Sequence, residues 1–291
     1  MMLRLYGDES GTNDITGQQP GSAVPALAGL IDTPEYWLEF CIKWKRILDS
    51  YRAPFFHFRE FASKHLCSKP SSPYYGWSEK KRHGFLYDLA IQTSESAIPI
   101  GGAYPAKRNY NLGLPGNAFE IAIVNFYESC LFELDLHWPK YDGKVLFVLD
   151  HCDDDRWVVP LHKVHANYSA KDSRIGGLTF EDDKDPLHLP LQAADLTSYI
   201  FRQYAESFVN NEGKEAPPLR VLDLIINRNL EIGLRQTNMA TWDKIIRLIC
   251  EDEKRQMAIW KKEGKQNQKY YPDKHFPFEK YGFNPPTRNA I

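Results

Sequence analysis

KVLFVLD (Lys144–Asp150) is the stretch that decides the fold class of this chain. The Asp142-Gly143 turn signal precedes it, and its near-continuous apolar run is typical of a strand buried on both faces of a sheet. Such strands occur almost only in proteins whose sheet carries helices on both sides. The stretch therefore predicts an α/β protein, with one central strand that ends in the carboxylate of Asp150.

Outward from this strand, the chain alternates strand-like and helix-like segments. The predicted strands are Leu3–Asp8, Ala23–Ile31, Ile98–Tyr104 and a short edge strand, Gly177–Phe180. The predicted helices are Pro34–Ser50, Ser78–Glu95, Asn117–His137, Val158–Tyr168 and Pro190–Ile200. The first of these helices is expected to bury Leu38, Ile42 and Leu48.

The last third of the chain has a different pattern. Residues 1–205 are expected to form one domain, and residues 206–291 a helical C-terminal extension. Its final stretch, Lys265–Ile291, loses periodicity and mixes lysines with aromatic residues. Basic side chains interleaved with aromatic rings can bind phosphates and stack on bases, but such a tail can equally pack on its own domain.

The composition of the chain limits the classes of protein to which it can belong. The chain has 291 residues, 43% of them apolar, which is enough for a sizeable core. Its formal net charge of -2 supplies no overall basic field, so nucleic-acid binding would need local patches. Five scattered cysteines without C-x-x-C spacing, together with the lack of a leader or a long apolar segment, predict a cytoplasmic protein outside the membrane.

Two predicted strands end in a carboxylate, Asp8 and Asp150, where open α/β sheets build their ligand sites. In the helix that follows Pro190, Gln192 and Asp195 share one face. Clustered carboxylates repel each other, and Mg²⁺ or Mn²⁺ relieves that repulsion. Spacing alone is also compatible with structural roles, in which Asp8 caps a turn, Asp150 starts a loop and Asp195 pairs with a basic side chain.

Two motifs extend the interpretation by resemblance. DESG (Asp8–Gly11) after the first strand and LQAADL (Leu191–Leu196) late in the chain resemble the DUF3800 family, together with His57 and the strand ending at Asp150. The resemblance covers about residues 3–204. It implies a ribonuclease-H-like mixed sheet flanked by helices. Two departures from that pattern are a long polar loop after DESG and an opening meander of which only two strands are clear.

The resemblance also assigns roles to residues. It implies that Asp8, Asp150 and Asp195 bind the metal and that Glu9 lies close by. Ser10 and Gln192 are then expected to support these ligands or to contact substrate.

His57 lies in a segment dense in phenylalanine, where it is either a proton shuttle or metal ligand, or a packed core histidine. In the acidic run Asp153–Asp155, Asp153 alone is a further candidate carboxylate, although consecutive acids in a loop are usually solvated.

The leading hypothesis from the sequence is a phosphodiesterase, specifically a nuclease, that depends on Mg²⁺ or Mn²⁺. Its catalytic residues would be Asp8, Glu9, Asp150 and Asp195, and its partner a nucleic acid, with DNA and RNA both open. Two alternatives stay open. One is a binding module for nucleic acid or protein without catalysis, and the other is a toxin or defence component that acts only inside a complex. The sequence leaves the oligomeric state open.

Overall fold

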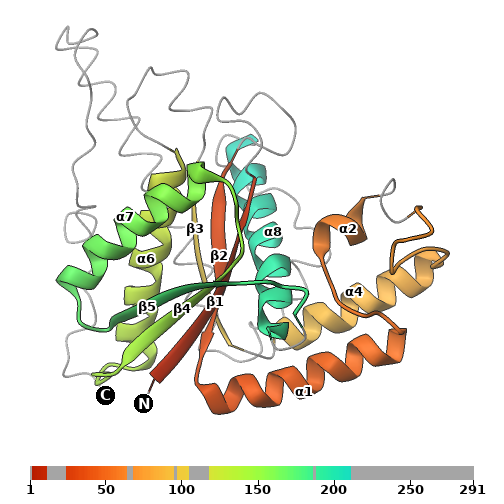
Figure 1. Ribbon diagram of the computed structural model, residues 1–291, viewed down its shortest axis with the longest axis horizontal. Coiled ribbons are helices and arrows are strands. Elements are labelled where there is room, and N and C mark those ends of the chain that lie inside the picture. Colours follow the sequence, from red (N-terminus) through yellow and green to blue (C-terminus); the bar gives the residue numbers. More distant parts are fainter. Residues whose placement is uncertain are drawn as a thin grey trace, which may run out of the picture.

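The computed structural model describes residues 2–11, 24–63, 68–94, 97–104, 118–185 and 188–210 (Figure 1). Its strands are β1 (Met2–Ser10), β2 (Ala26–Asp32), β3 (Ile98–Ala103), β4 (Lys144–Asp150) and β5 (Ile175–Glu181). Its helices are α1 (Pro34–Tyr51), α2 (Phe58–Ala62), α4 (Glu79–Ser94), α6 (Ala118–His137), α7 (Asp155–Lys171) and α8 (Leu189–Asn210). Every predicted strand and helix of residues 1–205 is present, and most ends are shifted by three residues or fewer. The last helix is the exception, since it ends at Asn210 and not at Ile200, and the short helix α2 was not predicted.

The five strands form one mixed sheet in the order β3-β2-β1-β4-β5. β1, β2 and β3 pair antiparallel, whereas β4 pairs parallel with β1 and β5 parallel with β4. The sheet with its flanking helices confirms the predicted ribonuclease-H-like fold class. The opening meander is complete in the structure. The meander is not evident in the sequence because α1, α2 and α4 separate β2 from β3 along the chain.

Helices cover both faces of the sheet (Figure 1). α6 and α7 cover one face, over a core that includes Leu5, Phe126 and Phe147. α8 and α1 cover the other, over a core that includes Tyr6 and Val148. Side chains alternate between the two faces along a strand. Asp8 lies two positions after Tyr6, and Asp150 lies two positions after Val148. Both carboxylates therefore belong to the α8 side of the sheet.

The packing of α1 differs from the prediction. Thr33 caps this helix by accepting a hydrogen bond from the backbone N–H of Tyr36. The predicted burial of Leu48 is confirmed, but Leu38 is 67% exposed and Ile42 is 47% exposed. The buried stripe instead consists of Trp37, Phe40, Trp44 and Leu48. A stripe of large aromatic rings removes more apolar surface from water than the competing aliphatic stripe does, so it determines which face of α1 turns inward.

α8 runs without a break past residue 205, the expected end of the domain, to Asn210. The expected C-terminal extension from residue 211 onward, with its basic and aromatic tail, lies outside the described residues. Among the helices that the structure describes, none is long and apolar enough to cross a membrane.

Candidate metal centre

The first part of the site lies at the carboxyl ends of β1 and β4. In their parallel register Gly7 pairs with Leu149, so the next residues, Asp8 and Asp150, are neighbours on adjacent strands. Neighbouring strands lie about 4.8 Å apart, and both carboxylates belong to the α8 side of the sheet. Asp8 is buried, with 8% of its surface exposed. The structure therefore brings together the two strand-end carboxylates that the sequence predicted.

α8 supplies Asp195 and packs on β1 and β2. One oxygen of its carboxylate, Oδ2, accepts a hydrogen bond of 2.5 Å from the backbone N–H of Phe58, the first residue of α2. This bond fixes the start of α2 against α8. It thereby brings His57, the residue immediately before α2, to the acidic cluster.

Asp183, which follows β5, is a site residue that the sequence reasoning missed. Its side chain is 5% exposed, and its backbone N–H donates to Asp150 Oδ1 over 3.0 Å. The signal was present, because β5 runs parallel to β4 and its last residue, Glu181, begins the acidic run Glu181–Asp183. The rule that singled out Asp8 and Asp150 as strand-end carboxylates applies to this third strand as well.

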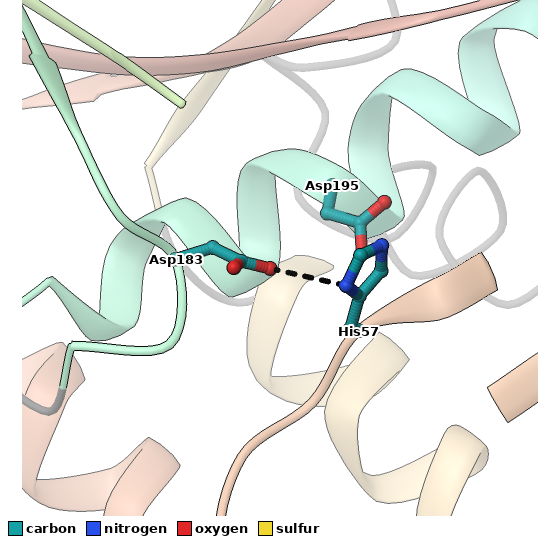
Figure 2. A group of neighbouring side chains, drawn as sticks. All are labelled: His57, Asp183 and Asp195. Atoms are coloured by element: carbon teal, nitrogen blue, oxygen red, sulfur yellow. Dashed lines mark ion pairs between the residues drawn. The ribbon is translucent and has the colours of Figure 1, made fainter. Parts of the chain in front are cut away.

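Three of these side chains converge (Figure 2). His57, Asp183 and Asp195 each offer one ligand atom, and these atoms all lie within 4.8 Å of one another, so the group could hold a metal ion. His57 Nδ1 points toward Asp183 Oδ2 at 3.8 Å. That nitrogen is buried and has no hydrogen-bond partner among the described residues. Of the three predicted metal ligands, only Asp195 belongs to this group, whereas Asp8 and Asp150 lie beside it.

The electrostatics of the group show how costly its charges are. Burial raises the pKa of Asp183 to about 7, and the negative charge of Asp150 adds to this effect. Burial also raises the pKa of Asp195 to about 7, although the nearby His57 and the N–H of Phe58 favour its charged form. A cation bound here would offset the desolvation and repulsion of both carboxylates.

The pKa of Asp8 is affected by all the other carboxylates of the cluster. Burial raises the pKa of Asp8 well above its usual range, and the charges of Glu9, Asp195, Asp150 and Asp183 raise it further. Glu9 lies near enough to take part, since the two side chains interact directly. The predicted carboxylates therefore form one electrostatic unit with Asp183, even though only two of its members belong to the three-residue group of Figure 2.

The burial of Glu9 raises its pKa too, while a hydrogen bond with the thiol of Cys152 counteracts this shift. The Glu9 side chain is therefore held next to Asp8 and against the segment that follows β4.

The two predicted supporting residues have different surroundings. Ser10 Oγ accepts a hydrogen bond of 2.9 Å from Arg202 Nε on α8, at the outer end of the DESG motif. Gln192 is fully buried, and its amide binds three segments of the chain. The glycine of the motif, Gly11, has φ +85°, and a Cβ there would meet the carbonyl oxygen of Val24 at 2.4 Å. Only glycine adopts this conformation without strain.

Asp153 lies apart from the cluster. Its side chain is 94% exposed and pairs with His151 Nε2 over 3.0 Å, as expected for a solvated loop. Its neighbour Asp154 caps α7 by accepting from the backbone N–H of Arg156. Neither side chain is part of the group His57, Asp183 and Asp195.

The donor set fits a divalent cation. Carboxylate oxygens suit Mg²⁺ and Mn²⁺, and imidazole nitrogen suits transition metals. The Nδ1 atom of His57 is buried and forms no hydrogen bond with the described residues, so it could coordinate a metal ion. A scan against protein-family models found none that matches this chain, and a search of the curated proteins found no match. The site and the fold are therefore the basis on which a function can be inferred.

Proposed function

We propose that this chain is a metal-dependent phosphodiesterase, and specifically a nuclease, that uses Mn²⁺ or Mg²⁺. The observation that carries the proposal is the group His57, Asp183 and Asp195, next to two further carboxylates at the ends of adjacent parallel strands. A bare acidic site would repel an anionic phosphodiester. A site that combines these charges with an unpartnered histidine nitrogen is suited to bind that substrate through a cation.

A divalent cation, when bound, polarises phosphate oxygens and lowers the pKa of water. The chain's own residues hold the ligands in place. The backbone N–H of Phe58 fixes the carboxylate of Asp195, and the carboxylate of Asp150 fixes the backbone of Asp183. Two of the three ligands are thus oriented by bonds from outside the group, which is the support that metal ligands need.

The mixed donor set favours one metal over the other. Mg²⁺ prefers ligands that are all oxygen, whereas a site with one imidazole nitrogen and two carboxylates suits Mn²⁺ better. We therefore expect Mn²⁺ to bind more tightly than Mg²⁺ and to support the higher activity. The resemblance to DUF3800, which depends on the DESG and LQAADL motifs, is part of this proposal.

The test is cleavage of labelled single-stranded and duplex DNA and RNA in Mn²⁺, in Mg²⁺ and in EDTA. We expect at least one substrate to be cut in Mn²⁺ and none in EDTA. Asp195→Asn should lower the rate about 10²-fold or more, because the variant loses a carboxylate that would hold the ion, and with it the stabilisation of transition-state charge that the ion would supply. Asp153→Asn is the matched control, because that carboxylate is 94% exposed and outside the group.

Two results would count against the nuclease. Cleavage that survives EDTA or Asp195→Asn would show that the activity comes from another site or a contaminant. Metal binding without cleavage of any substrate would instead support the non-catalytic binding module.

A further inference from the structure

Gln192 uses every hydrogen-bonding atom of its side chain in the interior. Its Oε1 accepts from Trp44 Nε1 over 3.0 Å and from the backbone N–H of Phe56 over 2.9 Å. Its Nε2 donates to the backbone carbonyl of Asp183 over 2.9 Å. The side chain is fully buried, so it cannot contact a substrate from solvent.

These three bonds connect the segments that carry the ligands of the candidate metal centre. Phe56 directly precedes the ligand His57, and the Asp183 carbonyl belongs to the second ligand itself. Gln192 lies one helical turn before the third ligand, Asp195, on α8. The amide of Gln192 therefore connects the three segments that carry His57, Asp183 and Asp195. Its bond to Trp44 also connects these segments to α1.

The segments that carry His57 and Asp183 are also held by hydrogen bonds to other segments, from the N–H of His57 to Tyr74 Oη and from the N–H of Asp183 to Asp150 Oδ1. His57 lies just before the short helix α2, and Asp183 lies in the turn after β5, so neither belongs to a strand ladder. The requirement for an amide is chemical. One end of the side chain must accept two N–H groups while the other donates to a carbonyl, which an ionised carboxylate or an apolar side chain cannot do.

We propose that Gln192 is a positioning residue that sets the spacing of His57, Asp183 and Asp195 and thereby their affinity for the metal. The inference rests on the proposed function, because it assumes that the group binds a cation. Groups that do not touch the metal but orient its ligands through hydrogen bonds typically contribute about 10-fold to 100-fold to metal affinity. The loss of Gln192 should therefore weaken Mn²⁺ binding by about that factor.

The test is Mn²⁺ titration of the full chain, followed by calorimetry and by electron paramagnetic resonance, with the melting temperature of each variant measured in EDTA. Gln192→Met keeps the volume of the side chain and removes all three bonds. Gln192→Asn keeps the amide but shortens its reach by one methylene, so the proposal stays testable if the methionine variant fails to fold. Ser129→Ala is the control, because this buried serine accepts from the N–H of Gly101 on the opposite face of the sheet.

We expect both Gln192 variants to bind Mn²⁺ at least about 10-fold more weakly, with a changed resonance spectrum of the bound ion. Ser129→Ala should lower the melting temperature without changing the Mn²⁺ affinity. A folded Gln192 variant that binds Mn²⁺ within about two-fold of the wild-type would overturn the positioning role. Failure of the wild-type itself to bind Mn²⁺ would overturn the proposed metal centre, and this role with it.

Discussion

His57 is the residue whose interpretation changed most between sequence and structure. A histidine among phenylalanines is compatible with a packed core residue, and the sequence alone left that reading open. In the structure its buried Nδ1 lacks a hydrogen bond and points toward Asp183. A core histidine is expected to have this atom satisfied, because an unpaired buried polar atom costs about 1–3 kcal/mol. The unpaired nitrogen therefore supports the proposed role of His57 as a metal ligand.

His57→Ala should weaken Mn²⁺ binding by about 10-fold or more, and Mg²⁺ binding by less, because Mg²⁺ depends mainly on the oxygens. His151→Ala is the matched control, since His151 is largely exposed and pairs only with Asp153 among the described residues. Calorimetric titration of both variants with both metals measures the difference. Equal losses for the two metals, or for the two variants, would contradict the role of His57 as a ligand.

The carboxylates predict an unusual pH dependence. In the folded, metal-free protein the pKa of Asp183 and that of Asp195 are both about 7, above the ordinary value of about 3.9. The folded state then binds protons more tightly than the unfolded state. Stability from these groups is present below about pH 4 and is lost as the pH rises to about 7. Mn²⁺ should restore it where the carboxylates are ionised.

We therefore expect the melting temperature in EDTA to fall between pH 5 and pH 8, and Mn²⁺ to raise it strongly at pH 8 but weakly at pH 5. Asp195→Asn should flatten the fall in EDTA and remove most of the effect of Mn²⁺. Thermal unfolding followed by circular dichroism checks both. A melting temperature in EDTA that rises across this range would contradict the raised pKa values.

Among the elements, α1 shows where sequence periodicity falls short. Two stripes on this helix have helical spacing, one aliphatic with Leu38 and Ile42, and one aromatic with Trp37 and Trp44. Periodicity is the same for both, so it locates the helix correctly but leaves open which face turns inward. The hydrogen bond from Trp44 to Gln192, 148 positions away in the chain, forms only because the aromatic face of α1 turns inward.

Leu48 and Leu38 provide a matched pair on this helix. Leu48→Ala should lower the free energy of unfolding by about 2–5 kcal/mol, because the side chain is fully buried. Leu38→Ala should change it by about 0.5 kcal/mol or less, because that side chain is 67% exposed. Urea denaturation measures both values. A loss for Leu38→Ala as large as that for Leu48→Ala would mean that α1 packs in the way the sequence first suggested.

For the molecule as a whole, the sequence predicted the strands, every helix except α2 among those described, and the pair Asp8 and Asp150, because strand patterns and strand ends are local signals. It missed Asp183, because the predicted edge strand ends at Phe180, one residue before the end of β5, and the pattern of that strand does not extend to the acidic residues that follow. It also left the opening meander incomplete, because the helices inserted between β2 and β3 separate strands that pair in space. The group His57, Asp183 and Asp195 depends on contacts between distant segments, which no local pattern contains.

The most direct test of the central claim is a crystal structure of the protein soaked in Mn²⁺, with anomalous diffraction to locate the ion. We predict a peak about 2 Å from His57 Nδ1 and from one carboxylate oxygen each of Asp183 and Asp195. A second ion held by Asp8 and Asp150 would be compatible with this account. The absence of any Mn²⁺ between His57, Asp183 and Asp195 would contradict it.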